Sequence, residues 1–283
     1  MSGFSPEWLA LREPVDHRSR DAALAAELQA AFAGRASAAI VDLGCGTGSN
    51  VRGTFHLLPA EQHWTLVDYD PRLLAAARTT LAQWAGVNPL PQGDALNLTH
   101  SGKRLHVTFR QADLNTGLDA ALGPALGPAP DLITASAFFD LCSERFISRL
   151  ATAIAARRAA FFTVLTYNGE QTWTPTHPAD DMMRQSFCAH QLSDKGFGAS
   201  SGPSAPGALA RAFRAAGYRV SDGDSPWRLG PADLPLITDL ASGFAAAVAE
   251  TGTVHADVIA SWSAVARTGA NVGHTDTLAL PAL

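Results

Sequence analysis

The stretch that decides the fold is Val41-Asp42-Leu43-Gly44-Cys45-Gly46-Thr47-Gly48. The apolar run 38–41 predicts a buried strand, and residues 50–58 are expected to form a helix that ends before Pro59. Glycines at alternate positions let the backbone turn tightly and approach a ligand where any Cβ would clash. Because the following helix offers free N–H groups, the stretch predicts a nucleotide-type ligand at the carboxyl end of the first strand.

A dinucleotide-binding loop is the nearest alternative for this stretch. Its fingerprint places a third glycine three residues after the second, and here that position is Ser49. The carboxylate of Asp42 would repel two phosphates and attract an ammonium. The pattern therefore favours a nucleotide ligand that carries a cationic amino-acid moiety.

The rest of the chain alternates between strand and helix patterns. Apolar or alternating runs predict strands, and Ala/Leu-rich amphipathic segments predict helices. This spacing is typical of an α/β protein with a doubly wound, mostly parallel sheet. The predicted strands are 38–42, 63–67, 105–111, 131–136, 159–166, 218–221 and 273–280, and the predicted helices are 7–33, 50–58, 71–84, 144–156, 208–216, 231–250 and 254–267.

The glycine-rich stretch resembles the first motif of class I S-adenosylmethionine-dependent methyltransferases. Three further segments follow in that family's order: Leu66–Pro71 at the end of the second strand, Gln111–Leu114 at the end of the third, and Asp131–Ser136 as the fourth strand. The resemblance extends over residues 38–166. It implies a Rossmann-like fold with a seven-stranded sheet, in which the last strand lies antiparallel beside the fifth, and S-adenosyl-L-methionine as the cofactor.

The resemblance implies a set of cofactor-binding residues. Asp68 corresponds to the acidic residue that binds both ribose hydroxyls, and Tyr69 would lie against the adenine. Asp113 would accept a hydrogen bond from the adenine amino group beside Leu114, although it is also a good N-cap for a helix starting at Asn115. The remaining members of the set are Asp42, Gly44, Cys45, Gly46, Gly48 and Asn50 in the glycine-rich stretch and Ser136 beside the methyl group. Apart from the resemblance, the N-terminal segment 8–16 is expected to place Arg12 near the cofactor carboxylate or over the site, with Arg18 as the alternative.

Four residues are candidates for handling the acceptor. Asp140 follows the fourth strand as a base or amine anchor, with a helix cap before Ser143 as the alternative. Tyr167 ends the fifth strand and begins a polar, aromatic segment that we expect to act as a lid. Within it, His190 has a side chain that accepts a proton near neutral pH, and Asp194 is placed to bind substrate. Solvated loop residues are the alternative for both.

The expected domain organisation follows from these segments. Residues 1–37 form an N-terminal helical cap, 38–166 the cofactor-binding core, 167–207 a substrate lid, and 208–283 the rest of the sheet with a helical insertion at 231–267. No metal site is expected, because His177, Asp180, Asp181 and His190 match no compact ligand spacing.

Composition narrows the choice of compartment. The chain has 283 residues, of which 47% are hydrophobic and 17% charged, a globular balance. Its cysteines, Cys45, Cys142 and Cys188, are widely and irregularly spaced, which favours a reducing compartment. The N-terminal residues lack the apolar core of a signal peptide, and no apolar run approaches the ~20 residues of a membrane span. We therefore expect a cytoplasmic protein with no membrane partner.

The net charge of the chain indicates which class of acceptor to expect. With 21 Lys and Arg against 26 Asp and Glu, the net charge is −5, and no basic cluster exceeds a pair such as Arg157–Arg158, so a nucleic-acid partner is disfavoured. The Asn/Asp-Pro-Pro-aromatic tetrad of enzymes that methylate exocyclic base or glutamine nitrogens does not follow the fourth strand, where Ser136–Phe139 stand.

The sequence thus predicts methyl transfer from S-adenosyl-L-methionine to the O, N or C of a small-molecule acceptor. One alternative is a nucleic-acid methyltransferase. The other is a non-methyl user of the fold, either an aminopropyltransferase or a cofactor-binding module, which the carboxylates Asp140, Asp180 and Asp181 keep open. The acceptor's identity and the oligomeric state are left open.

Overall fold

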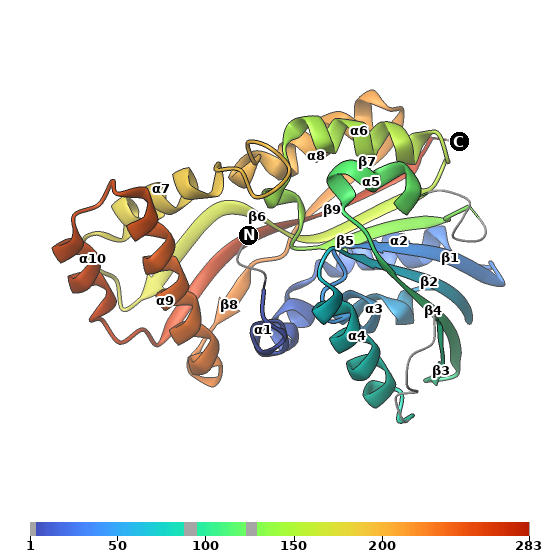
Figure 1. Ribbon diagram of the computed structural model, residues 1–283, viewed down its shortest axis with the longest axis horizontal. Helices are drawn as coiled ribbons and strands as arrows, with labels where there is room; N and C mark the ends of the chain where they lie inside the picture. The colour runs from blue at the N-terminus through green and yellow to red at the C-terminus, as the bar shows by residue number, and fades with distance from the viewer. Residues whose placement is uncertain (1–3, 88–94, 123–128, 283) are drawn as a thin grey trace.

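A computed structural model describes residues 4–87, 95–122 and 129–282 (Figure 1). The described residues form one nine-stranded sheet of order β3-β4-β2-β1-β5-β6-β9-β7, with β8 paired to β9. The strands are β1 (Ser37–Leu43), β2 (Glu61–Asp68), β3 (Ala95–His100), β4 (Lys103–Gln111), β5 (Leu132–Ser136), β6 (Ala160–Thr174), β7 (Tyr218–Asp224), β8 (Trp227–Leu229) and β9 (Gly269–Pro281).

Helices cover both faces of this sheet (Figure 1). Successive strand residues face opposite layers, so Ile40 packs with the cluster under α1–α4 whereas Val41 packs with the cluster under α5, α6 and α8. The helices are α1 (Pro6–Ser19), α2 (Ala22–Ala31), α3 (Ser49–Thr54), α4 (Pro71–Trp84), α5 (Leu114–Ala121), α6 (Glu144–Ala155), α7 (Asp180–Gln191), α8 (Ala205–Ala215), α9 (Leu234–Thr251) and α10 (Ala256–Ser263).

The predicted fold class is confirmed, and the sheet is larger than expected. The seven expected strands are β4, β2, β1, β5, β6, β9 and β7, and the final strand β9 runs antiparallel between β6 and β7. The two further strands are β8 and β3, which forms an antiparallel hairpin with β4. Strand β3 lies between α4 and β4, in a segment of which residues 88–94 lie outside the described part of the chain.

The fifth predicted strand does not end at Thr166. It continues as β6 to Thr174, and from Gln171 onward it pairs with residues 269–272 of β9. Residues 170–174 alternate between exposed and buried side chains, which is the pattern of a strand with one covered face. The expected lid over residues 167–207 therefore begins with strand and continues as helix α7, so Tyr167 lies inside a strand.

The extension of β6 and β9 carries three helices beyond the main sheet (Figure 1). Helix α9 packs between α7 and α10. Its Phe244 ring lies 5.6 Å from Trp173 on β6, 4.6 Å from Phe187 on α7 and 5.4 Å from Trp262 on α10. The segment 231–251 is long and apolar enough to cross a membrane by composition. Its buried side chains, however, serve as the core of this helical unit.

Candidate cofactor and acceptor site

A cavity of about 540 Å³ opens at the carboxyl ends of β1, β2, β4 and β5, a size that suits a small organic ligand. Ligands of open α/β sheets bind at this edge. Its floor comes from the glycine-rich loop and the turns after β2, β4 and β5. Helix α1 covers one side with Leu9, Arg12 and Asp16, and the loop after α7 covers another with Lys195, Gly196 and Phe197.

The glycine-rich loop takes a conformation that side chains would disturb. Gly44, Gly46 and Gly48 have φ values of 63°, 54° and 76°, in the left-handed region that favours glycine. A Cβ at Gly44 would lie 2.8 Å from a ring carbon of Phe138, and one at Gly46 would lie 3.1 Å from Leu9. The loop therefore requires glycine for its turn and for the close approach of its neighbours.

Asp68 links the glycine-rich loop to the turn after β2 at the floor of the cavity. One carboxylate oxygen accepts a 2.9 Å hydrogen bond from the backbone N–H of Gly46, and the other accepts one of the same length from Asp70. Burial raises the pKa of Asp68, and the N–H groups of Asp70 and Gly46 partly offset this effect. Each oxygen keeps a second lone pair, so Asp68 is able to hold the loop and still accept from a ligand in the cavity.

The residues predicted for the adenine also lie at the cavity. Tyr69 is 62% exposed and lines it with Leu114 and Asp113. Asp113 also caps α5, because it accepts a 2.9 Å hydrogen bond from the backbone N–H of Asn115. The alternative role predicted for Asp113, that of an N-cap, is therefore confirmed. Asp70 caps α4 through the N–H of Arg72.

Two residues predicted to bind the cofactor, Asp42 and Gly48, are not among the residues that line the cavity. Asp42 is completely buried and accepts a 2.7 Å hydrogen bond from Asn50, which also donates to Thr134 and itself lines the cavity. Burial raises the pKa of Asp42 to about 7. Gly48 N-caps α3. In strand β1 the side chain of Asp42 points into the protein, so its carboxylate supports the glycine-rich loop. Asp42 does not line the cavity, so it makes no direct contact with the ammonium group that a ligand there would carry.

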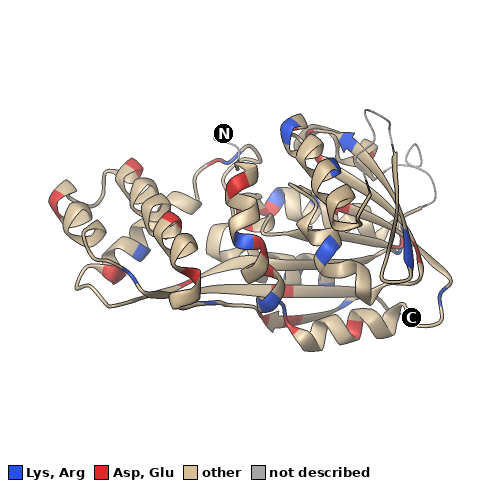
Figure 2. Ribbon diagram, turned by 90° about the horizontal axis from the view of Figure 1, so that it is seen from below, with Lys and Arg blue, Asp and Glu red and all other residues tan. Residues whose placement is uncertain are grey.

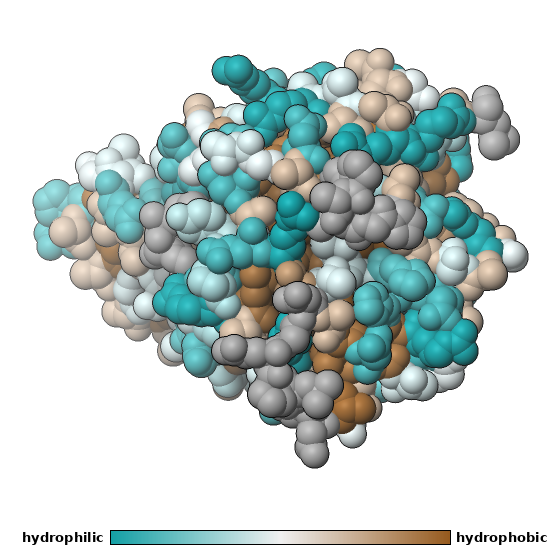
Figure 3. Space-filling view, turned by 45° about the vertical axis from the view of Figure 1, so that its right-hand side comes forward, coloured by the Kyte–Doolittle hydropathy of each residue, from teal (hydrophilic) through white to brown (hydrophobic). Residues whose placement is uncertain are grey.

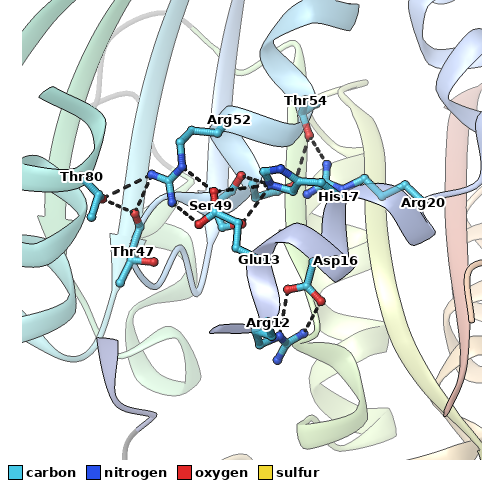
Figure 4. A network of polar contacts seen from close by, with 11 residues as sticks. Arg12, Glu13, Asp16, His17, Arg20, Thr47, Ser49, Arg52, Thr54 and Thr80 are labelled. Carbon is cyan, nitrogen blue, oxygen red and sulfur yellow. Dashed lines mark hydrogen bonds and ion pairs between the residues drawn. The ribbon is translucent and has the colours of Figure 1, made fainter. Parts of the chain in front are cut away.

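Helix α1 is fastened to the glycine-rich loop by polar contacts (Figure 4). The guanidinium of Arg52 donates to the Glu13 carboxylate at 2.5 and 2.6 Å and to the carbonyl oxygen of Thr47 at 3.1 Å. The imidazole of His17 lies 3.0 Å from the carbonyl oxygen of Ser49. These contacts hold the side of α1 that bears Leu9, Arg12 and Asp16 over the cavity, and we call the pair Glu13–Arg52 the latch.

Arg12 reaches the cavity as predicted, but it is not a free cation. Its Nε and Nη2 donate to Asp16 at 2.8 and 3.3 Å, and its guanidinium lies 5.0 Å from the ring centroid of Trp227. Asp16 also accepts from the indole N–H of Trp227 at 3.0 Å. The sequence reasoning missed Asp16 and Trp227. The i, i+4 spacing of Arg12 and Asp16 on a predicted helix was the one available signal.

None of the four predicted catalytic residues is among the residues that line the cavity. Asp140 and Tyr167 are buried behind Phe138 and Leu141, which do line the cavity. Burial raises the pKa of Asp140 to about 6 and that of Tyr167 well above its usual value. Asp140 belongs to the 3-10 turn Phe139–Leu141, so it does not cap α6, whose N-cap is Ser143.

The other two predicted catalytic residues organise the loop after α7. His190 sits at the end of α7, with Nε2 2.9 Å from Glu250 and 3.4 Å from the Lys195 ammonium. Asp194 accepts hydrogen bonds from the N–H groups of Gly196 and Gly198 at 2.7 and 3.0 Å. Both side chains therefore shape or support the segment 195–197, and that segment is what contacts the cavity.

Comparison with solved structures bears on the fold. No protein-family model matches the chain, and no curated protein matches it in sequence. The YcgJ protein from Bacillus subtilis superposes with a TM-score of 0.51 at 14% identity, covering 94% of this chain and 99% of that one. BH2331 from Bacillus halodurans, a candidate methyltransferase, gives 0.50 at 10% identity over 91% and 99%.

The cyclopropane synthase MmaA2 from Mycobacterium tuberculosis also gives a TM-score of 0.50 at 10% identity, over 98% of this chain and 94% of that one. These matches extend over nearly the full length of each partner, so they concern the whole architecture. At such identities the likeness is one of fold. The chain has the Rossmann-like α/β fold of class I S-adenosylmethionine-dependent methyltransferases, as its glycine-rich stretch predicted.

Proposed function

We propose that the protein is an S-adenosylmethionine-dependent methyltransferase that acts on a small-molecule acceptor. The observation that carries this proposal is the position of Asp68. Its carboxylate bridges the glycine-rich loop and the turn after β2 while it lines the cavity. A ligand with a vicinal diol, such as a ribose, fits the lone pairs that remain on its two oxygens.

The residues around the cavity fit the parts of this cofactor. Asp68 would bind the ribose, Tyr69 and Leu114 would sandwich the adenine, and Asp113 would accept from its amino group. Gly44 and Gly46 allow Phe138 and Leu9, which line the cavity, to approach the loop to within 2.8 and 3.1 Å of where a Cβ would stand. When bound, S-adenosylmethionine supplies a methyl group on a positively charged sulfur. The protein's part is to position the acceptor and to remove its proton.

Two features support a small acceptor rather than a nucleic acid. Lys and Arg are interspersed with Asp and Glu over the ribbon in Figure 2, consistent with the net charge of −5. Nucleic-acid binding relies on a continuous basic surface. The space-filling view likewise shows hydrophilic and hydrophobic residues mixed over one face (Figure 3). Helix α1 and segment 195–197 also narrow the access to the cavity.

The function is tested by incubating the purified protein with S-adenosylmethionine and a small-metabolite extract. We expect S-adenosylhomocysteine to accumulate together with a product 14 mass units heavier than its precursor, and Asp68→Ala protein to produce neither. Methylthioadenosine in place of S-adenosylhomocysteine would show transfer of the cofactor's 3-amino-3-carboxypropyl chain, and the same product formed only with decarboxylated S-adenosylmethionine would show aminopropyl transfer. Cofactor binding by calorimetry without any product from the extract would support a binding module.

The latch Glu13–Arg52 should control how quickly the cofactor leaves. Its side chains are 19% and 9% exposed, so the ion pair is largely shielded from water. In Glu13→Gln protein we expect S-adenosylhomocysteine to dissociate about tenfold faster, equivalent to about 1.4 kcal/mol. Stopped-flow tryptophan fluorescence measures this rate. The matched control is Glu27→Gln, which removes the ion pair between Glu27 on α2 and Arg219 on β7. Equal rates for Glu13→Gln and wild type would disprove the latch.

A further inference from the structure

A row of buried polar and aromatic side chains continues from the cavity into the protein behind α1. The guanidinium of Arg12 lies 5.0 Å from the ring centroid of Trp227 on β8, whose ring lies 5.2 Å from His274 on β9. The His274 ring lies 6.2 Å from Tyr167 on β6. Asp140 stands beside this row, since its turn packs against β6. We call these five residues the inner wall.

The five side chains of the inner wall are buried, but each keeps a small accessible surface. Its members keep 3–9% of their surface accessible, whereas Phe139, Leu165 and Thr166, their neighbours in the chain, keep none. Arg12 belongs both to the inner wall and to the lining of the cavity. Arg12 therefore connects the inner wall with the cavity, whose lining also includes Ser136, the last residue of β5, and Phe138.

Two side chains of the inner wall, those of Asp140 and His274, have polar atoms that no other described residue pairs, whereas the Tyr167 hydroxyl and the Trp227 indole N–H have partners. Among residues 4–87, 95–122 and 129–282, no other side chain or N–H group donates to the Asp140 carboxylate. His274 Nδ1 is buried and likewise has no hydrogen-bond partner there. The hydroxyl of Tyr167 approaches Cys188 Sγ at 3.9 Å. Because buried polar groups are ordinarily hydrogen-bonded, the unpaired Nδ1 of His274 and the Asp140 carboxylate indicate a place for a polar ligand.

The charge of the inner wall is unbalanced. Arg12 is engaged with Asp16 through two hydrogen bonds, so these two charges offset each other. Burial and the charge of Arg12 lower the pKa of His274 to about 3, which leaves its imidazole neutral. Asp140 then contributes a negative charge that no ion pair among the described residues compensates. A buried carboxylate without a counter-ion favours a cationic ligand or one with N–H donors.

We propose that the inner wall binds the methyl acceptor and that this acceptor is a small aromatic amine-bearing molecule whose nitrogen donates to Asp140. This inference rests on the proposed methyltransferase function. The rings of Trp227 and Tyr167 supply apolar surface for the body of such a ligand, although the guanidinium of Arg12 already lies over the Trp227 ring. Asp140 lies two residues after Phe138, which places it next to the methyl-transfer end of the cavity.

The bound ammonium gives one proton to the Asp140 carboxylate, which frees the nitrogen lone pair. That lone pair forms the N–C bond to the methyl carbon as the C–S bond breaks, and the bonding electrons remain on sulfur. The products are the methylated ammonium and S-adenosylhomocysteine, and Asp140 then releases its proton to solvent.

The test uses three probes of one shape and different charge: 2-phenylethylamine, 2-phenylethanol and phenylacetate. Calorimetry first measures S-adenosylhomocysteine binding to the protein and then titrates each probe into the loaded protein. We expect the amine to bind at least tenfold more tightly than the alcohol or the acid. Asp140→Asn should lose that preference, Asp140→Glu should keep it, and Asp181→Asn, an exposed carboxylate on α7, should behave as wild type.

The outcomes separate this inference from the proposed function. Wild-type protein that fails to bind S-adenosylhomocysteine would overturn the cofactor site, and the inference with it. Protein that binds S-adenosylhomocysteine but not the amine, or that prefers the alcohol or the acid, would overturn the amine acceptor alone. Amine preference that survives in Asp140→Asn would overturn the role of Asp140. Retained S-adenosylhomocysteine affinity shows that each variant is folded.

Discussion

Asp68→Ala protein should fail to bind S-adenosylmethionine. The carboxylate would accept two hydrogen bonds from a ribose, each worth roughly 1.5–3 kcal/mol, so their loss weakens binding by about 10²- to 10⁴-fold. The substitution also removes the acceptor for the N–H of Gly46, which lies 2.9 Å from Asp68 in the wild type. The glycine-rich loop then loses part of its support. Isothermal titration calorimetry measures the dissociation constant directly.

The control for this experiment is Asp119→Ala, which removes an exposed carboxylate from α5 and should leave the affinity unchanged. Circular dichroism checks that both proteins are folded. Binding of S-adenosylmethionine by Asp68→Ala with wild-type affinity would refute the assignment of the cavity to this cofactor.

Asp42 should make the stability of the protein depend on pH. Burial raises its pKa from 3.8 to about 7 in the folded chain, and the hydrogen bond from Asn50 and the charge of Arg20 offset this only in part. Between these two values the folded chain holds a proton that the unfolded chain has released. The free energy of unfolding therefore falls as the pH rises from 4 to 7, by about 4 kcal/mol from this group.

Asn at position 42 has no such proton and still accepts a hydrogen bond from Asn50. We therefore expect the stability of wild type relative to Asp42→Asn to decrease by about 4 kcal/mol between pH 4 and pH 7, as measured by urea denaturation. Asp119→Asn should show no comparable trend. A difference between wild type and Asp42→Asn that stays constant over this range would mean that Asp42 is ionised in the folded protein.

Short-range patterns were enough to predict the part of the site that lies along the glycine-rich loop. Gly44 and Gly46 were predictable because a left-handed turn at a strand end admits few other residues. Asp68 and Asp70 were predictable because a strand end followed by Pro71 fixes which residue faces the cavity and which caps the helix. In each case the signal lies within a few residues of the feature.

The acceptor side followed no such local pattern. Residues 167–174 contain polar and glycine residues that look like a loop, and they form a strand because β9, about a hundred residues later, pairs with them. Arg12, Trp227 and His274 come from three distant elements and meet only when α1, β8 and β9 are packed. The burial of Asp42, which takes it away from the ligand, also depends on the layer of helices above β1.

The sequence by itself determined the fold class, seven of the nine strands and the glycine-rich floor of the cavity. These depend on hydrophobic periodicity and backbone sterics, which act between near neighbours in the chain. Only the tertiary structure decided the length of β6, the closure of the cavity by α1 through Glu13 and Arg52, and the inner wall around Asp140. Those features depend on pairing and burial between distant segments, whose energies no local pattern encodes.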